Sequence, residues 1–208
     1  MKKNTSPARA PSRVPSRPKT LPREVRIIGG LYKRSKLPVA DKPGLRPTPD
    51  RVRETLFNWL AHVSGDELAG WRCVDAFAGT GALGFEAASR GATHVLLVEQ
   101  DPALVAQLKA TQLRLQASAV QVVRGDGLSI LRSQAPGQTR LVFLDPPFEA
   151  PVFEAALKAA SNTLSPGGWI YLEAPKAWND DDLAEYGLTV YRHLKAGAVH
   201  AHLLQRAS

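Results

Sequence analysis

The regular alternation of apolar runs with amphipathic segments between residues 72 and 173 limits the fold of this chain most strongly. In chain order, strands alternate with helices over residues 72–77, 81–90, 94–99, 102–116, 119–124, 127–134, 140–144, 151–163 and 168–173. Strands that read as nearly continuous Val, Leu and Ile are typical of a parallel sheet with helices on both faces. The pattern therefore predicts an α/β fold.

Different patterns flank this region on both sides. Strands at 187–194 and 198–205, separated by Lys195-Ala196-Gly197, predict a C-terminal antiparallel hairpin. On the N-terminal side, Thr48 as a hydroxyl cap followed by Pro49 predicts a helix over 49–62. We expect a disordered basic tail at 1–23, a basic β-hairpin and proline-rich loop at 24–48, and one catalytic domain at 49–208.

Positive charge is concentrated at the N-terminus. Of the net charge of +8, residues 1–53 contribute +12, so residues 54–208 carry −4. Lys33, Arg34 and Lys36 are part of this charge and fall on the expected hairpin. Such a segment can neutralise nucleic-acid phosphates, although a tail that only improves solubility has the same composition.

Composition excludes several classes of protein. The single cysteine, Cys73, allows no intramolecular disulfide and no cysteine-based zinc site. His200 and His202 alternate on one strand without ligand partners at metal-binding spacing, so no metal site is expected. No apolar run approaches the length of a membrane span, and a cytoplasmic, monomeric protein is expected.

A glycine-rich loop follows the first strand of the alternating region. Gly79, Gly81 and Gly84 form a G-x-G-x-x-G sequence, and Glu99 stands twenty residues after Gly79. Glycines permit a tight turn, the helix N-terminus favours an anionic group, and Glu99 could accept hydrogen bonds from ribose hydroxyls. The spacing alone fits both a dinucleotide such as NAD and S-adenosylmethionine.

Two aspartates bear on this ambiguity. Asp75 lies at the end of the same strand, where a carboxylate would repel a pyrophosphate and attract a ligand with sulfonium and ammonium groups. Asp126, in Gly125-Asp126-Gly127, is placed to meet an adenine amino group. For both residues, a helix cap or a loop hydrogen bond is the alternative role.

The most informative tetrapeptide ends the fourth strand, Asp145-Pro146-Pro147-Phe148. An aromatic amino nitrogen is a poor nucleophile because its lone pair is delocalised. The Asp145 carboxylate and the Pro146 carbonyl can each accept one N–H and direct the lone pair at a methyl carbon. The prolines restrict the backbone of the residues before them, and Phe148 could stack on an extruded base. The alternative is an ordinary strand-to-helix loop.

The chain resembles the RsmD family of 16S rRNA guanine-N2 methyltransferases over residues 25 to about 204. The resemblance is carried by R-I-I-G-G at 26–30, G-L-R-P-T at 44–48, D-R-V-R-E-T-L-F-N-W-L at 50–60, F-A-G-T-G-A-L-G at 77–84 and D-P-P-F at 145–148. The second and third stretches are specific to this family, whereas many amino-methyltransferases share the last two. Pro49 stands where the pattern leads one to expect a second threonine.

The resemblance implies a Rossmann-like class I methyltransferase with a seven-stranded sheet, S-adenosylmethionine as donor, and guanine 966 of 16S rRNA in a partly assembled small subunit as target. It implies cofactor binding by Asp75, Phe77, Gly79, Gly81, Glu99 and Asp126, guanine binding by Asp145, Pro146, Pro147 and Phe148, and further substrate contacts by Arg46, Thr48 and Arg51. A DNA or RNA adenine-N6 methyltransferase, an NAD-type dehydrogenase and a non-enzymatic RNA-binding protein are the alternatives.

Overall fold

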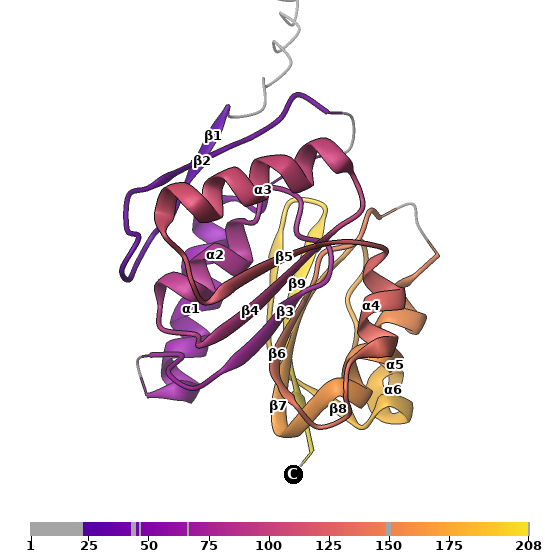
Figure 1. Ribbon diagram of the computed structural model, residues 1–208. Helices are drawn as coiled ribbons and strands as arrows, with labels where there is room; N and C mark the ends of the chain where they lie inside the picture. The colour runs from indigo at the N-terminus through magenta and orange to yellow at the C-terminus, as the bar shows by residue number, and fades with distance from the viewer. Residues whose placement is uncertain (1–22, 43–44, 46, 66, 149–150, 208) are drawn as a thin grey trace, which may run out of the picture.

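A computed structural model describes residues 23–207 except 43–44, 46, 66 and 149–150. It contains a seven-stranded sheet in the order β5-β4-β3-β6-β7-β9-β8 (Figure 1). The strands are β3 (Arg72–Asp75), β4 (His94–Glu99), β5 (Val120–Arg124), β6 (Thr139–Leu144), β7 (Leu164–Ala174), β8 (Leu188–Ala196) and β9 (Val199–Arg206). The first five are parallel, and β9 pairs antiparallel with both β7 and β8. The predicted sheet with its terminal hairpin is confirmed.

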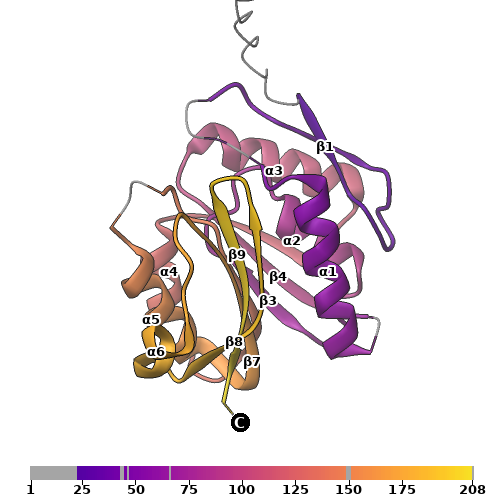
Figure 2. The same cartoon turned by 180° about the vertical axis from the view of Figure 1, so that it is seen from behind.

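Helices cover both faces of the sheet (Figures 1 and 2). On one face lie α1 (Asp50–Ser64), α2 (Ala82–Ser89) and α3 (Pro102–Leu115), and on the other lie α4 (Gly127–Ser133), α5 (Phe153–Thr163) and α6 (Asp180–Leu183). The sheet thus separates two apolar cores, one around Phe57 and Phe143 and one around Leu157 and Ile170. The sequence pattern missed α6 and the 3-10 turn Ala184–Tyr186 after it, because such short elements show no periodicity.

The strand order brings two distant motifs to one edge of the sheet. β6 lies beside β3, with Leu141 opposite Cys73 and Phe143 opposite Asp75. Because both strands run in the same direction, the glycine loop after β3 and the Asp145 motif after β6 leave the sheet at the same edge. This is the point at which the strand order reverses, where ligands of open α/β sheets bind.

The N-terminal hairpin is a separate two-stranded sheet. It consists of β1 (Glu24–Arg26) and β2 (Lys36–Pro38), which pair antiparallel as predicted. The Gln107 side chain on α3 donates to the Pro38 carbonyl at 2.7 Å, so the hairpin is attached to the helical layer that contains α2 and α3 (Figure 1). The expected disordered tail at 1–23 lies, but for Arg23, outside the described residues and stays a prediction.

The start of α1 differs from the prediction in one respect. Its N-cap is Pro49, without a side-chain cap, and the Pro49 carbonyl accepts from the backbone of Val52 and Arg53. The prediction that Thr48 caps this helix is therefore wrong. Its hydroxyl instead donates to Oε1 of Glu173 at 2.7 Å, because a buried carboxylate needs donors inside the protein.

One further observation concerns the described part of the chain. None of its helices combines the length and apolar character needed to cross a membrane.

The histidines of the C-terminal hairpin contact the protein itself. His202 is fully buried and accepts the backbone N–H of Trp178 at 3.1 Å, and a ring nitrogen of His193 lies 2.9 Å from one of His200. No group of three or more possible ligands among the described residues is placed to hold a metal ion.

Candidate active site

The glycine loop makes a close turn between β3 and α2. Gly79 and Gly81 have positive φ angles of 51° and 77°, a region that residues with a Cβ rarely adopt. A Cβ on Gly81 would also lie 2.6 Å from the side chain of Leu108. The sequence thus places glycine where both the backbone and the packing require it, and the loop leads directly into the N-terminus of α2 at Ala82.

Asp75, the last residue of β3, contacts this turn. It is 1% exposed, and its Oδ2 accepts the backbone N–H of Gly84 at 3.1 Å. Burial raises the pKa of Asp75 to about 7, the Gly84 N–H opposes the shift, and the charge of Glu99 adds to it. The loop hydrogen bond that was the alternative role for Asp75 is therefore present. No described Lys or Arg forms an ion pair with the Asp75 carboxyl.

Glu99 and Asp126 both hold backbone N–H groups at this edge. Glu99 accepts from Gly79 at 3.0 Å and from Asp101 at 2.8 Å, so it links the glycine loop to the start of α3. Asp126 caps α4 by accepting from Ser129 at 2.8 Å, and this contact lowers the pKa of Asp126. The capping role expected as an alternative for Asp126 is realised, and its carboxyl is exposed at the same edge.

Asp145 follows the last residue of β6. Leu144 pairs with Leu172, so Asp145 and Glu173 are the next residues of two adjacent parallel strands. Burial raises the pKa of Asp145 well above its usual value, and the charges of Glu173 and then Asp75 raise it further. Pro146 is buried, Phe148 is partly exposed and Pro147 is exposed, so the motif lines the edge of the sheet.

Glu173 is the third carboxylate of this cluster. It is 4% exposed, and its Oε1 accepts from the hydroxyls of Thr48 and Tyr171, both at 2.7 Å. Burial raises the pKa of Glu173, while the two hydroxyls oppose that shift. Asp75 and Glu173, both buried, and half-buried Asp145 thus gather three carboxyl groups, called here the carboxylate cluster, at the carboxyl ends of three adjacent strands.

Comparison with known proteins gives a consistent result. The family model described as "Conserved hypothetical protein 95" matches residues 25–205. The chain is 42% identical to ribosomal RNA small subunit methyltransferase D of Escherichia coli K12, over 88% of this chain and 90% of the relative, and 44% identical to the protein of that name in Haemophilus influenzae, over 74% and 80%.

The chain belongs to the family described by this model, which spans residues 25–205. The resemblance to the RsmD family seen in the sequence is confirmed. Among solved structures, yhhF of E. coli is similar with a TM-score of 0.74 and 39% identity, covering 89% of this chain and 99% of that one. A Thermus thermophilus protein is similar with a TM-score of 0.70 and 28% identity, over 88% and 99%.

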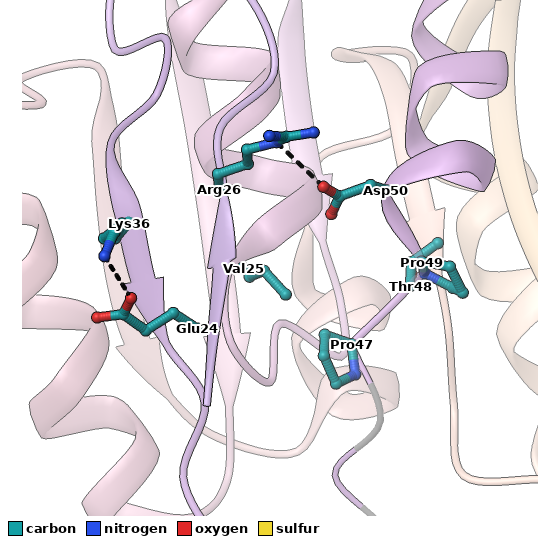
Figure 3. Close-up of a pocket in the computed structure, with 8 residues that line it drawn as sticks. All are labelled: Glu24, Val25, Arg26, Lys36, Pro47, Thr48, Pro49 and Asp50. Carbon is teal, nitrogen blue, oxygen red and sulfur yellow. Dashed lines mark ion pairs between the residues drawn. The ribbon is translucent and has the colours of Figure 1, made fainter. Parts of the chain in front are cut away.

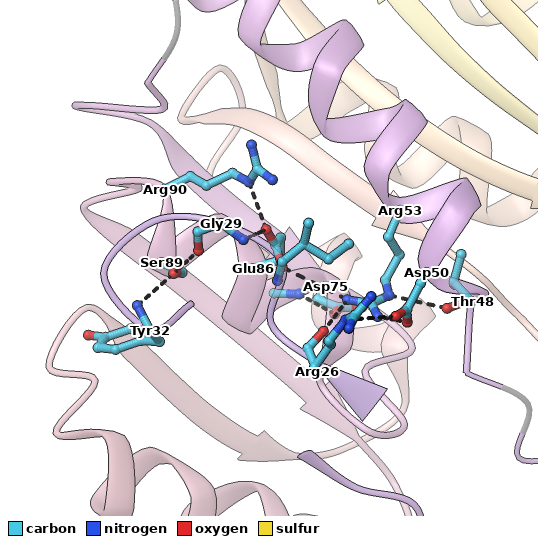
Figure 4. Close-up of polar contacts among 12 residues, drawn as sticks. Arg26, Gly29, Tyr32, Thr48, Asp50, Arg53, Asp75, Glu86, Ser89 and Arg90 are labelled. Atoms are coloured by element: carbon cyan, nitrogen blue, oxygen red, sulfur yellow. Dashed lines mark hydrogen bonds and ion pairs between the residues drawn. The ribbon is translucent and has the colours of Figure 1, made fainter. Parts of the chain in front are cut away.

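A second buried charge group fixes the family-specific segment around Thr48 to the domain (Figure 4). The fully buried Arg53 side chain donates to the carbonyls of Thr48 and Arg26 at 3.2 and 2.9 Å and to Asp50 at 2.5 Å. Its guanidinium also lies 3.8 Å from fully buried Glu86. This Arg53–Glu86 network joins α1, α2 and the hairpin.

The network continues from Glu86 into the hairpin. Glu86 accepts from the backbone of Ile28 at 2.6 Å and of Gly29 at 2.9 Å, and from the Arg90 side chain at 2.7 Å. Sequence reasoning placed Glu86 on a helix but gave it no role. A glutamate within the otherwise apolar stretch Gly84–Ala88 was the available signal, since buried carboxylates require partners.

Four of the predicted substrate residues on the N-terminal side fall into two groups. Thr48 contacts the carboxylate cluster, and exposed Arg51 lies in the first turn of α1 three residues later, whereas Arg46 lies outside the described residues. Lys33 and Arg34 lie in the hairpin turn, next to Ser89 at the end of α2 opposite the glycine loop. These two residues do not border the cluster, and their contact with RNA stays a prediction.

Lys36 differs from both groups. Its ammonium pairs with Glu24 at 2.8 Å beside a cavity of about 570 Å³ between the hairpin and the start of α1 (Figure 3). Arg26 and Asp50, 3.2 Å apart, form a second ion pair in its lining. The charges around this cavity are therefore already neutralised by the protein, unlike those of the carboxylate cluster.

Proposed function

We propose that this chain transfers the methyl group of S-adenosylmethionine to the N2 amino group of a guanine in small-subunit rRNA. The observation that carries the proposal is the placement of Asp145, in the D-P-P-F motif, beside the glycine loop at the switch point of the sheet. The relatives at 42% and 44% identity are ribosomal RNA small subunit methyltransferases by name, which supports the same substrate class for this chain.

The carboxylate cluster fits a cationic cofactor. Asp75, Asp145 and Glu173 are carboxyls whose pKa values are all raised by burial, so a nearby cation stabilises their charged forms. A dinucleotide would instead bring a pyrophosphate toward negative charge, which disfavours the dehydrogenase alternative. We assign Asp75, Phe77, Gly79, Gly81, Glu99 and Asp126 to cofactor binding.

S-adenosylmethionine, when bound, supplies an electrophilic methyl group on a positively charged sulfur. A cation near the cluster lowers the pKa of Asp145, so its carboxylate becomes a hydrogen-bond acceptor when the cofactor is present. Asp145 and the Pro146 carbonyl then accept the two N–H groups of the target amine and orient its lone pair. Phe148, partly exposed after the two prolines, stacks on the extruded base.

The N-terminal segment supplies the RNA side of the site. We assign Arg46, Thr48 and Arg51 to the border of the base pocket, and Lys33, Arg34 and Lys36 to phosphate contacts further away. A small subunit is the substrate particle in this proposal. The enzyme acts as a monomer in the cytoplasm, where such particles are assembled.

A single labelling experiment tests the proposal. Methyl-labelled S-adenosylmethionine is offered with assembled small subunits, naked 16S rRNA and duplex DNA, and the labelled nucleosides are identified after digestion. The expected result is N2-methylguanosine at one position of the small-subunit rRNA, with no label from the Asp145→Ala variant. N6-methyladenine in DNA or RNA would favour the adenine-N6 alternative instead.

Thermal unfolding with added ligand separates the non-methyltransferase alternatives. S-adenosylmethionine should raise the unfolding temperature, since a ligand that binds only the folded state stabilises it, and NAD should not. A shift with NAD alone would support a dehydrogenase. No shift with either ligand, together with RNA binding, would support a non-enzymatic RNA-binding protein.

A further inference from the structure

Glu173 occupies a position that the assigned site does not use. Because β6 and β7 are neighbours and Leu144 pairs with Leu172, Glu173 and Asp145 stand side by side where the two strands end. Adjacent strands are about 4.8 Å apart, so the backbones of these two residues are close enough for both side chains to reach one base. Glu173 also affects the pKa of Asp145 more than any other charged group.

The two hydroxyls on Glu173 fix its position and oppose the rise in its pKa that burial causes. Thr48 and Tyr171 each donate to Oε1, the first from the loop before α1 and the second from β7 itself. Hydroxyl donors stabilise the ionised form of a carboxyl, which can only accept hydrogen bonds. The described residues donate hydrogen bonds only to Oε1 of Glu173, so its Oε2 can accept from a donor on a ligand.

Guanine and adenine differ on the edge that would meet these carboxyls. Guanine has a donor, N1–H, beside its N2 amino group, whereas adenine has an acceptor, the N1 lone pair, beside its N6 amino group. Both bases therefore offer an amino group to Asp145, and the neighbouring ring nitrogen distinguishes them. Proteins that bind unpaired bases commonly hydrogen-bond this edge.

We infer that Glu173 is a specificity-determining residue, which accepts N1–H of guanine while the adjacent Asp145 accepts the N2 amino group. The inference rests on the proposed function, since it assumes a base held by Asp145. Adenine would place its N1 lone pair against the Glu173 carboxylate, and a buried polar group without its partner is costly. A site built around such a donor discriminates strongly against bases that lack it.

The test uses a base that keeps the methyl-accepting group and lacks the N1 proton. In 2,6-diaminopurine the N2 amino group remains while N1 is an acceptor. Small subunits are reconstituted with guanine or 2,6-diaminopurine at the target position, and kcat/KM is measured for the full-length enzyme. We expect the wild-type enzyme to prefer guanine by about 100-fold or more.

The variant Glu173→Gln keeps the shape of the side chain but can donate an amide N–H to N1. Its preference for guanine should fall by at least about tenfold, because it loses rate on guanine and gains it on 2,6-diaminopurine. Glu185→Gln, which changes an exposed carboxylate far from the cluster, is the matched control and should leave both rates unchanged. Thermal unfolding of each variant verifies that it is folded.

The possible outcomes separate the two proposals. Equal wild-type rates on guanine and 2,6-diaminopurine overturn the inference while the proposed function stands, and this measurement needs no variant. A Glu173→Gln enzyme that loses the same factor on both bases also overturns it, since the residue would then act on structure alone. A wild-type enzyme that methylates neither particle contradicts the proposed function, and the inference fails with it.

Discussion

Two groups of buried charge lie on the same side of the sheet and differ in one respect. In the Arg53–Glu86 network, buried Arg53 and Glu86 each have charged partners and backbone partners. In the carboxylate cluster, the donors to Asp75 and Glu173 among the described residues are all neutral, and no described Lys or Arg pairs with Asp145. Paired charges hold a structure together, whereas buried like charges cost stability and prepare a site for a cationic ligand.

Thr48 connects the two groups. Its carbonyl accepts from Arg53 in the network, and its hydroxyl donates to Glu173 in the cluster. The network therefore holds in place a residue that contacts the carboxylate cluster. This arrangement predicts that changes in the network act on stability first and on methyl transfer through Thr48, whereas changes in the cluster act on chemistry and ligand binding.

The largest effect is expected from Arg53→Met. The change leaves the carbonyls of Thr48 and Arg26 without their donor and leaves Asp50 without its pairing with Arg53, while Glu86 keeps Arg90. Loss of this buried charged donor should cost about 3–5 kcal/mol in the free energy of unfolding. Chemical denaturation at neutral pH measures this loss. Arg51→Met, on an exposed position of the same helix, is the matched control and should change stability little. A stability loss below about 1 kcal/mol would contradict a structural role for the network.

Asp145→Ala tests the carboxylate cluster through methyl transfer, whereas Arg53→Met tests the network through stability. Methyl transfer should fall by two or more orders of magnitude, about 3 kcal/mol of transition-state stabilisation, while S-adenosylmethionine binding stays nearly intact. Single-turnover kinetics on small subunits and calorimetry on the free enzyme measure the two effects. Near wild-type turnover would show that Asp145 does not accept the target amino group.

The same contrast explains what the sequence could predict. Asp75 and Asp145 were found because each ends an apolar strand next to a recognisable motif, and the order of strands then placed them together. Glu173 also ends an apolar strand, but without a motif beside it, and its contact with Thr48 joins residues 125 positions apart. Such a contact depends on how the loop before α1 packs, which local patterns do not encode.

The error at Thr48 has the same cause. A threonine before Pro49 satisfies every local rule for a helix cap, and the structure uses its hydroxyl elsewhere because Glu173 is buried within reach. By contrast, all helices and strands of the alternating region were predicted to within a few residues, since their apolar periodicity is local. Tertiary hydrogen bonds between polar side chains are the part that single-sequence reasoning misses.

Glu99→Ala should weaken the cofactor by about 1.5–3 kcal/mol, because the variant loses a charged acceptor for ribose hydroxyls. The structure adds a second contribution, since Glu99 also holds the N–H of Gly79. Glu99→Gln keeps an acceptor for that N–H and should lose less. Calorimetric dissociation constants for both variants test this order, and an unchanged value for Glu99→Ala would leave Glu99 with a structural role alone.

The pH dependence of stability tests the cost of the cluster. The pKa of Asp75 rises from 3.8 to about 7 on folding, so between these values the native state binds more protons than the unfolded state. Stability of the ligand-free enzyme should therefore fall as pH rises through this window, by up to about 4 kcal/mol from Asp75. Asp75→Asn should reduce this dependence while retaining an acceptor for Gly84. An unaltered pH profile would contradict a protonated Asp75.

The smallest effect concerns the cations on the N-terminal side, where distance from the cluster decides the outcome. Arg51 follows Thr48 by three residues, whereas Lys33 and Arg34 lie beside the far end of α2. Arg51→Ala should lower kcat/KM on small subunits by about tenfold at fixed salt, as expected when one charged contact at the border of the base pocket is lost. The double variant of Lys33 and Arg34 to Ala should lower it less and mainly reduce its salt dependence. The reverse order would show that RNA is held chiefly by the hairpin turn, and that the Arg53–Glu86 network fixes an RNA-binding element in addition to Thr48.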